Sequence, residues 1–86
     1  MEKLSDLPNI GSSLEQKLIE AEISSPKQLV ELGSENAFLR LSVKNEAGCY
    51  NMLCALEGAV QGIRWHQLPK ERKEELKQFL KLKKYL

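Results

Sequence analysis

The sequence predicts a compact all-α domain of five to six short helices. Apolar residues recur at spacings of three and four, no segment alternates as a half-buried strand does, and Pro, Gly and Ser residues separate the periodic segments. The chain has 86 residues, 42% hydrophobic and 29% charged, as in an ordinary globular protein. A chain this short buries only about 60% of its unfolded surface. We therefore expect one domain over residues 1–86, with a core over residues 1–69 and a C-terminal helix over residues 70–86.

A tight turn near the N-terminus, Leu7-Pro8-Asn9-Ile10-Gly11, is expected to join two short helices at a steep angle. Pro8 fixes φ, Asn9 can adopt a left-handed conformation, and Gly11 allows one backbone to approach another. Leu4 and Leu7 form the first helical turn, and Ser12 or Ser13 caps the second helix. This is the pattern of a helix-hairpin-helix, in which the turn amides point outward and can bind an anion.

The same turn supports two interpretations. In the functional one it contacts phosphate, and the candidate residues are Pro8, Asn9, Ile10, Gly11, Ser12 and Ser13. In the structural one it only lets two helices pack. We favour the structural interpretation because the surrounding sequence is acidic and turn amides alone release few counterions from DNA.

The next segments follow helical periodicity. The second helix buries one face, carried by Leu14, Leu18 and Ala21, with Ile19 beside them. Ser25 caps a third helix with Pro26 at its first position, and this helix ends at Gly33. Its inward residues are expected to be Leu29, Val30 and Leu32.

Ser34 is expected to cap a fourth helix that contains Ala37, Phe38 and Leu41, followed by a polar segment over residues 42–46. Residues 47–63 carry the longest apolar stretch and form the predicted central helix. A ridge of small residues runs along it: Ala55, Gly58, Ala59 and Gly62. Glycine inside a helix costs about 1 kcal/mol relative to alanine, so we expect close helix packing at this ridge.

The last predicted helix follows Leu68-Pro69 and turns Leu76, Phe79 and Leu80 inward. A basic stripe lies outward on it: Lys73, Lys77, Lys81 and Lys84. Such a stripe suits nucleic acid, an acidic protein or membrane phospholipid, and the plainer alternative is a solvated helix face. Residues 1–62 hold five Lys or Arg against nine Asp or Glu, whereas residues 63–86 hold eight against three. We expect any DNA binding to be weak and non-specific, and we expect no membrane partner.

Few residues suit catalysis or metal binding. There is one His, one Asp and no cysteine pair at metal spacing, so neither a catalytic triad nor a tetrahedral zinc site can be built from one chain. Cys49 and Cys54 are expected to be reduced thiols in or near the core, and Trp65 is expected to fill the core. We expect Glu57 to be a structural carboxylate that bonds a neighbouring helix end or Arg64. We predict no cofactor and no enzymatic activity.

No apolar run approaches the roughly 18 residues that span a bilayer, and the first residues lack a signal peptide's apolar segment. We therefore expect a cytoplasmic protein.

Several segments together resemble the C-terminal domain of TfoX (Sxy) competence regulators: Leu4-x-x-Leu7-Pro8-Asn9-Ile10-Gly11, Leu18-x-x-Ala21-x-Ile23, Leu29-x-x-x-Gly33, and Leu53-x-Ala55-Leu56-Glu57-Gly58-Ala59-x-x-Gly62-x-x-Trp65-x-x-Leu68. The resemblance covers nearly all of residues 4–69. It implies an all-helical fold similar to helix-hairpin-helix and SAM-like domains, and no catalysis.

Two features depart from the family. Glu22 stands where the family usually has glycine at a left-handed helix end, a strain of about 1 kcal/mol. Met1 lies directly before the turn, so we expect no N-terminal TfoX domain, and a competence role that needs both domains is not expected to carry over.

The sequence therefore favours a non-enzymatic interaction module that binds a protein or nucleic-acid partner. The alternative is a DNA-binding helix-hairpin-helix that acts as an accessory regulator of transformation and competence.

Overall fold

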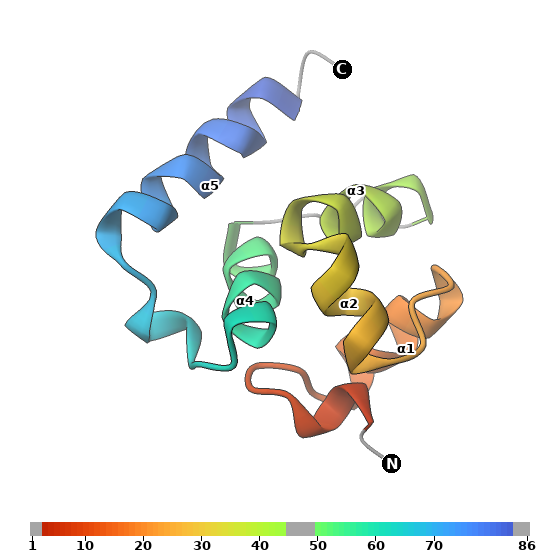
Figure 1. Ribbon diagram of the computed structural model, residues 1–86. Coiled ribbons are helices and arrows are strands. Elements are labelled where there is room, and N and C mark those ends of the chain that lie inside the picture. Colours follow the sequence, from red (N-terminus) through yellow and green to blue (C-terminus); the bar gives the residue numbers. More distant parts are fainter. Residues whose placement is uncertain (1–2, 45–49, 84–86) are drawn as a thin grey trace.

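Helix α4, Tyr50–Gln61, lies at the centre of the computed structural model, which describes residues 3–44 and 50–83 (Figure 1). It contacts α2 (Pro26–Leu32), α3 (Ser34–Lys44), α5 (Lys70–Lys83) and the short 3₁₀ helix η2 (Trp65–Gln67). Its buried residues are Leu53, Cys54, Leu56, Glu57, Gly58 and Ala59. A helix that is apolar over a wide arc is stable only with neighbours on several sides. The predicted central helix is thus confirmed over Tyr50–Gln61; its expected first residues, 47–49, lie outside the described residues.

The remaining elements are η1, a 3₁₀ helix over Leu4–Asp6, and α1 over Ser12–Glu20. The all-α class is confirmed: residues 3–44 and 50–83 contain five α-helices and no strand. Figure 1 shows α1, α2 and α3 on one side of α4, α5 on the other, and the turn after η1 below the end of α4. Among residues 3–44 and 50–83, none of the helices has both the length and the apolar character that a membrane span requires.

Two helices end on a left-handed residue. Glu22 has φ of 67°, with Ile23 N donating to Leu18 O at 2.8 Å, and Gly62 has φ of 76°, with Ile63 N donating to Gly58 O at 2.9 Å. Both hydrogen bonds are of the Schellman type, which satisfies carbonyls at a helix end. The left-handed conformation expected at Glu22 is confirmed, whereas the strain expected there stays a prediction. Gly62, in contrast, was expected inside the helix, and this expectation is wrong because the residue ends α4.

The predicted start signals are partly right. Ser25 caps α2, because its Oγ accepts from Gln28 N at 3.2 Å, and Gly33 ends α2 with φ of 86°. Ser12 and Ser13 cap nothing: Gly11 occupies the N-cap of α1 without a side-chain bond. Ser34 is the first residue of α3, and its hydroxyl donates to Glu57 at 2.5 Å in place of a capping bond.

The core contains most of the expected apolar residues, including Leu4, Leu18, Leu29, Phe38 and Leu76. Two expectations fail: Ile19 is 45% exposed and Val30 is 50% exposed. Each follows a fully buried leucine and is turned by about 100° from it, so α1 and α2 bury narrower stripes than expected.

Helix α3 also extends beyond its predicted end and continues to Lys44. The expected polar break at Ser42 is wrong, because its hydroxyl donates to Phe38 O at 2.9 Å and is satisfied within the helix. Residues 45 and 46 of the predicted polar segment lie outside the described residues.

Candidate functional site

The side chain of Asn9 fastens the Leu7–Gly11 turn to the end of α4. Its Nδ2 donates to Ile63 O at 3.0 Å and more weakly to Ala55 O at 3.4 Å, while its Oδ1 accepts from Trp65 N at 3.1 Å. Asn9 has φ of 70°, so its predicted left-handed conformation is confirmed. This conformation turns the amide toward the interior, where it satisfies backbone groups left free at the helix end.

Gly58 provides the space that the Asn9 side chain occupies. A Cβ at Gly58 would lie 2.7 Å from Ile63 O and 3.1 Å from Trp65 N, and it would also collide with Asn9 Nδ2. The predicted close contact at Gly58 is therefore confirmed. Its partners are the turn and the chain after α4, not a second helix as expected.

The other turn candidates divide between the interior and the surface. Ile10 is 5% exposed and belongs to the core, Pro8 is half-buried, and Gly11, Ser12 and Ser13 are exposed. A Cβ at Gly11 would meet no described atom within 4 Å, so the expected close backbone approach at Gly11 is not found. The nearby Glu15 carboxylate accepts from Ser5 N at 3.0 Å and places negative charge beside this surface. That charge opposes a polyanion.

Glu57 is the centre of a buried polar cluster that joins α3, α4 and α5. Its Oε1 accepts from Ser34 Oγ and lies 3.0 Å from an Arg72 guanidinium nitrogen, and its Oε2 accepts from Gln61. Burial alone raises the pKa of Glu57, but hydrogen bonds from Arg72, Ser34 and Gln61 and the charge of Arg72 outweigh burial and lower the pKa to about 2. Glu57 is therefore ionised at neutral pH and is a structural carboxylate, as predicted.

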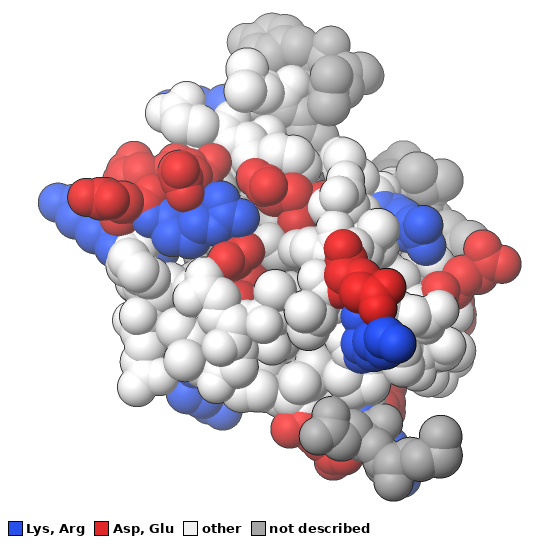
Figure 2. Space-filling model, viewed as in Figure 1, with Lys and Arg blue, Asp and Glu red and all other residues white. Residues whose placement is uncertain are grey.

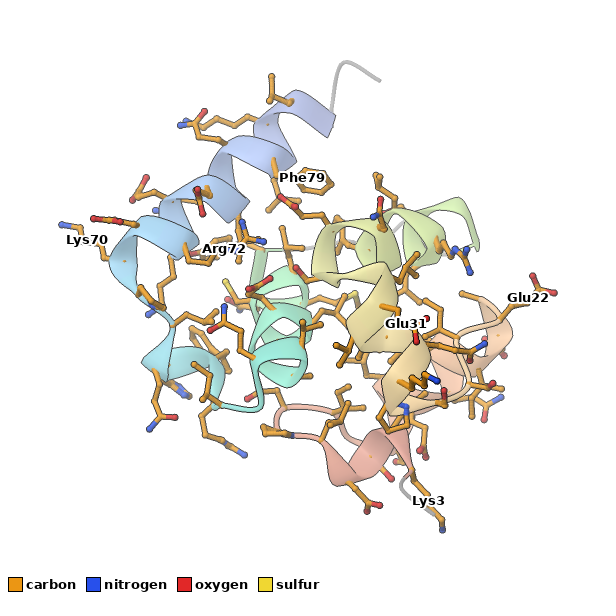
Figure 3. All side chains as sticks on the ribbon, in the orientation of Figure 1. Lys3, Glu22, Glu31, Lys70, Arg72 and Phe79 are labelled. Carbon is orange, nitrogen blue, oxygen red and sulfur yellow. The ribbon has the colours of Figure 1, made fainter. Side chains whose placement is uncertain are left out.

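Arg72 is the residue that the sequence interpretation missed. Figure 3 shows its side chain directed toward α4, whereas Lys70 points away from the molecule. Arg72 also lies 3.7 Å from Glu35 and 3.3 Å from Glu75, and the hydrogen bond to Glu57 is the main cause that raises its pKa. Of the two partners expected for Glu57, a neighbouring helix end is found in Ser34 at the start of α3, whereas Arg64 is exposed and does not contact Glu57. The pattern carried no signal for Arg72, because this contact depends on how α5 folds back on α4.

Two lysines of α5, Lys73 and Lys77, lie beside aromatic rings. Lys73 Nζ is 5.8 Å from the centre of the Trp65 ring and also donates to His66 O at 3.4 Å, and Lys77 Nζ is 5.7 Å from the centre of the Tyr50 ring. Lys81 is exposed, and Lys84 lies outside the described residues. On the face shown in Figure 2, basic and acidic side chains intermingle.

Trp65 is only half-buried, so the expected core filling is partial: the ring packs against the core and also stacks on His66 at a centroid distance of 4.0 Å.

Tyr50 is half-buried as well. Burial, together with the Cys54 thiol and the charge of Glu74, raises the pKa of Tyr50 to about 12, so its hydroxyl stays protonated at neutral pH.

No group of three or more His, Cys, Asp or Glu side chains in the described part of the chain is arranged to hold a metal ion. Cys54 is a buried free thiol, as expected, and Cys49 lies outside the described residues.

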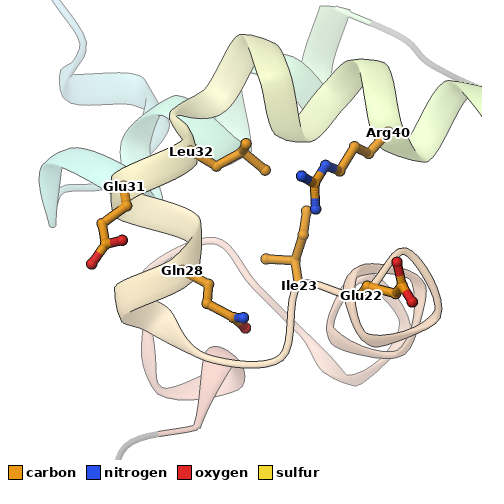
Figure 4. A pocket seen from close by; sticks show the side chains of 6 residues that line it. All are labelled: Glu22, Ile23, Gln28, Glu31, Leu32 and Arg40. Atoms are coloured by element: carbon orange, nitrogen blue, oxygen red, sulfur yellow. The ribbon is translucent and has the colours of Figure 1, made fainter.

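A shallow groove of roughly 250 Å³ lies between the end of α1, α2 and α3 (Figure 4). It is lined by Glu22, Ile23, Gln28, Glu31, Leu32 and Arg40. Its walls carry charges of both signs, and Glu31 also lies 3.9 Å from Lys27. Opposite charges on one rim favour no single class of ligand.

Comparison with known proteins identifies the family. The model of the TfoX C-terminal domain matches residues 1–80, from the turn through most of α5. The chain belongs to the TfoX C-terminal domain family. Protein Sxy of Escherichia coli (strain K12) is 40% identical over 75 residues, which cover 87% of this chain and 36% of Sxy. The chain thus spans about a third of the length of this TfoX-family relative.

Two solved structures from Listeria monocytogenes are also similar. An uncharacterized protein in a triclinic crystal form has a TM-score of 0.89 and 54% identity, covering 91% of this chain and 89% of its own. A protein of unknown function in a tetragonal form has a TM-score of 0.87 and 53% identity, covering 90% and 95%. The TfoX C-terminal fold described above is therefore also found in crystals.

Proposed function

We propose that this chain is a non-enzymatic regulatory module of the TfoX type, which acts by binding a protein or nucleic-acid partner. Membership in the TfoX C-terminal domain family and the similarity to Sxy support a role in the regulation of competence. One observation supports the binding function: no carboxylate pairs with Lys73, Lys77 or Lys81 among the described residues. The buried polar groups, in contrast, bond one another. An acid or base in catalysis needs a pKa near neutrality, and Glu57 is held far below it.

A gene deletion in the native host tests this function. We expect the deletion to lower transcript levels of DNA-uptake genes, and we expect the parent chain to restore them. The Lys77→Glu/Lys81→Glu variant is expected to restore them poorly although it accumulates to the same level. Unchanged transcripts in the deletion strain would contradict a regulatory role.

The alternative, a DNA-binding helix-hairpin-helix, is favoured by a different observation. Gly11, Ser12 and Ser13 are exposed at the start of α1, where free backbone amides attract anions. Gly11→Val is a clean test because a Cβ there meets no described atom within 4 Å. If the turn binds duplex DNA, this variant loses binding and the lysine pair keeps it; if α5 binds, the reverse holds.

Labelled duplex titrated at low salt, with circular dichroism to verify folding, separates these outcomes. We expect the parent to bind no duplex more tightly than about micromolar at 0.15 M salt, because screening weakens the few lysine contacts. Nanomolar binding that Gly11→Val abolishes would place the DNA-binding alternative first.

A further inference from the structure

One face of α5 presents lysines that contact rings instead of carboxylates. Lys73 lies over Trp65, Lys77 lies over Tyr50, and Lys81 continues the same face one turn later. The aromatic–lysine surface is defined here as Tyr50, Trp65, His66, Lys73, Lys77 and Lys81. Arg72, on another side of the same helix, is paired with Glu57 and Glu75. The arginine that pairs with carboxylates and the lysines that contact rings therefore lie on different sides of α5.

A ring and a carboxylate leave a lysine in different states. A carboxylate neutralises the ammonium, whereas an aromatic face attracts it weakly, by about 0.5–1 kcal/mol at an exposed site, and leaves the charge in place. The contact also restricts a long side chain before any partner arrives. Part of the ordering that binding would otherwise require is therefore already present in Lys73 and Lys77.

The ring pair beside these lysines offers a stacking platform. Trp65 and His66 stack with centroids 4.0 Å apart and an angle of 30°, and His66 is exposed while Trp65 is anchored against the core. An exposed ring next to a line of cations is the combination by which proteins hold unpaired bases and their phosphates. In a duplex the base faces are covered, so this platform suits a single strand.

We propose that the aromatic–lysine surface binds single-stranded nucleic acid, with one base stacked on His66 and the neighbouring phosphates bound by Lys73, Lys77 and Lys81. This inference rests on the binding function proposed above and names its partner. An acidic protein offers charges of the same sign but no flat base to extend the Trp65–His66 stack. Glu74, close enough to Tyr50 to affect its pKa, sets a limit on how strongly the surface attracts polyanions in general.

Trp65 is the only tryptophan, so its fluorescence reports directly on this surface. A 15-nucleotide oligothymidylate titrated at low salt is expected to quench the emission to saturation. The logarithm of the binding constant is expected to fall with the logarithm of salt with a slope of about −2, from roughly 0.7 per phosphate contact. Polyglutamate of similar charge is expected to bind at least tenfold more weakly and without quenching. Equal binding of polyglutamate would overturn the inference in favour of an acidic protein partner.

Variants separate stacking from charge, with affinity measured by the anisotropy of a labelled oligonucleotide. His66→Ala removes the exposed ring of the Trp65–His66 pair and is expected to weaken binding by about fivefold or more. Lys77→Gln is expected to reduce the salt slope by about 0.7. Lys27→Gln, the same change at an exposed lysine of α2, is the matched control and is expected to change neither value.

Two results would overturn the inference: unchanged affinity in His66→Ala, or a duplex of the same length that binds more tightly than the single strand. If the oligonucleotide does not bind while the gene deletion still alters transcripts, the named partner is wrong and the regulatory function stands. If the oligonucleotide binds as expected while the deletion changes no transcript level, single-strand binding at the aromatic–lysine surface is supported and the regulatory function is contradicted.

Discussion

The Leu7–Gly11 turn and the aromatic–lysine surface both carry groups that suit an anionic partner. They differ in where their polar side chains point: into the fold in the turn, and toward the surface on α5. Asn9 directs its amide into the fold and bonds Ile63 and Trp65. Lys77 keeps its charge above the Tyr50 ring. A side chain that satisfies buried backbone groups stabilises the fold and is not free to recognise a partner. Substitutions in the turn are therefore expected to alter stability, and substitutions of the lysines of the aromatic–lysine surface are expected to alter binding.

The largest effect is expected from Gly58→Leu, which places a side chain where Asn9 and the chain after α4 now lie. We expect a loss of about 3 kcal/mol in the free energy of unfolding, because the backbone atoms around Gly58 cannot move aside cheaply. Urea unfolding measures it. Asn51→Leu, an exposed position of the same helix, is the control and is expected to change stability by less than about 0.5 kcal/mol. Parent-like stability in Gly58→Leu would mean that the turn is not packed on α4.

Glu57→Gln tests how much the ion pair between Glu57 and Arg72 of α5 stabilises the fold. We expect a loss of about 2 kcal/mol at pH 7, because the half-buried Arg72, 26% exposed, loses its closest carboxylate. Glu31→Gln breaks the exposed pair with Lys27 and, as the control, is expected to change stability by less than about 0.5 kcal/mol.

The effect of Glu57→Gln is expected to depend on pH. The folded-state pKa of Glu57 is lowered from 4.5 to about 2, so its ionisation stabilises the fold above pH 4.5 and this contribution is lost as pH falls toward 2. The difference between parent and variant in urea unfolding is therefore expected to be full at pH 7 and to shrink between pH 4.5 and 2. A difference that stays constant down to pH 2 would exclude the Glu57 charge as its source.

Asn9→Gly removes the side-chain hydrogen bonds to Ile63 and Trp65 while keeping a residue that tolerates a positive φ. We expect a loss of about 1.5 kcal/mol, because Trp65 N and Ile63 O lose their partner in a partly buried site. Ser12→Ala, at the exposed start of α1, is the control for the turn surface and is expected to be nearly neutral. A variant as stable as the parent would show that the Asn9 bonds do not anchor the turn.

Glu22→Gly is expected to act in the opposite direction and to stabilise the fold by about 1 kcal/mol, because it relieves a left-handed conformation at a residue with a Cβ. Thermal unfolding monitored by circular dichroism measures the change. Gln16→Gly, the same replacement inside α1, is expected to destabilise by about 1 kcal/mol. Equal losses in the two variants would mean that φ at Glu22 carries no strain.

The smallest effect on stability is expected from Lys77→Glu/Lys81→Glu, less than about 0.5 kcal/mol, since neither lysine is paired with a carboxylate in the described part of the chain. Oligonucleotide binding is expected to be lost. Lys27→Glu/Arg40→Glu makes the same change of charge at exposed positions elsewhere and is expected to preserve binding. Equal loss in both pairs would point to net charge instead of a defined surface.

Local conformational features were predictable from single segments. The left-handed residues Asn9 and Glu22, the Ser25 cap and the end of α2 at Gly33 all follow from the intrinsic preferences of a few neighbouring residues. Their energies depend on φ, ψ and hydrogen bonds within one turn of chain. Even here the exposure of Val30 was missed, because periodicity gives the direction of a face but not its width.

The amino-acid sequence by itself determined the all-α class, the central place of α4 and the family. Only the tertiary structure decided that Asn9 covers Gly58, that Arg72 and not Arg64 pairs with Glu57, and that Lys73 lies over Trp65. Asn9 lies 54 residues from Ile63, and Arg72 lies 15 residues from Glu57. The physical reason is that helix formation depends on preferences within a few residues, whereas contacts between helices depend on their crossing geometry, which packing of the whole core selects.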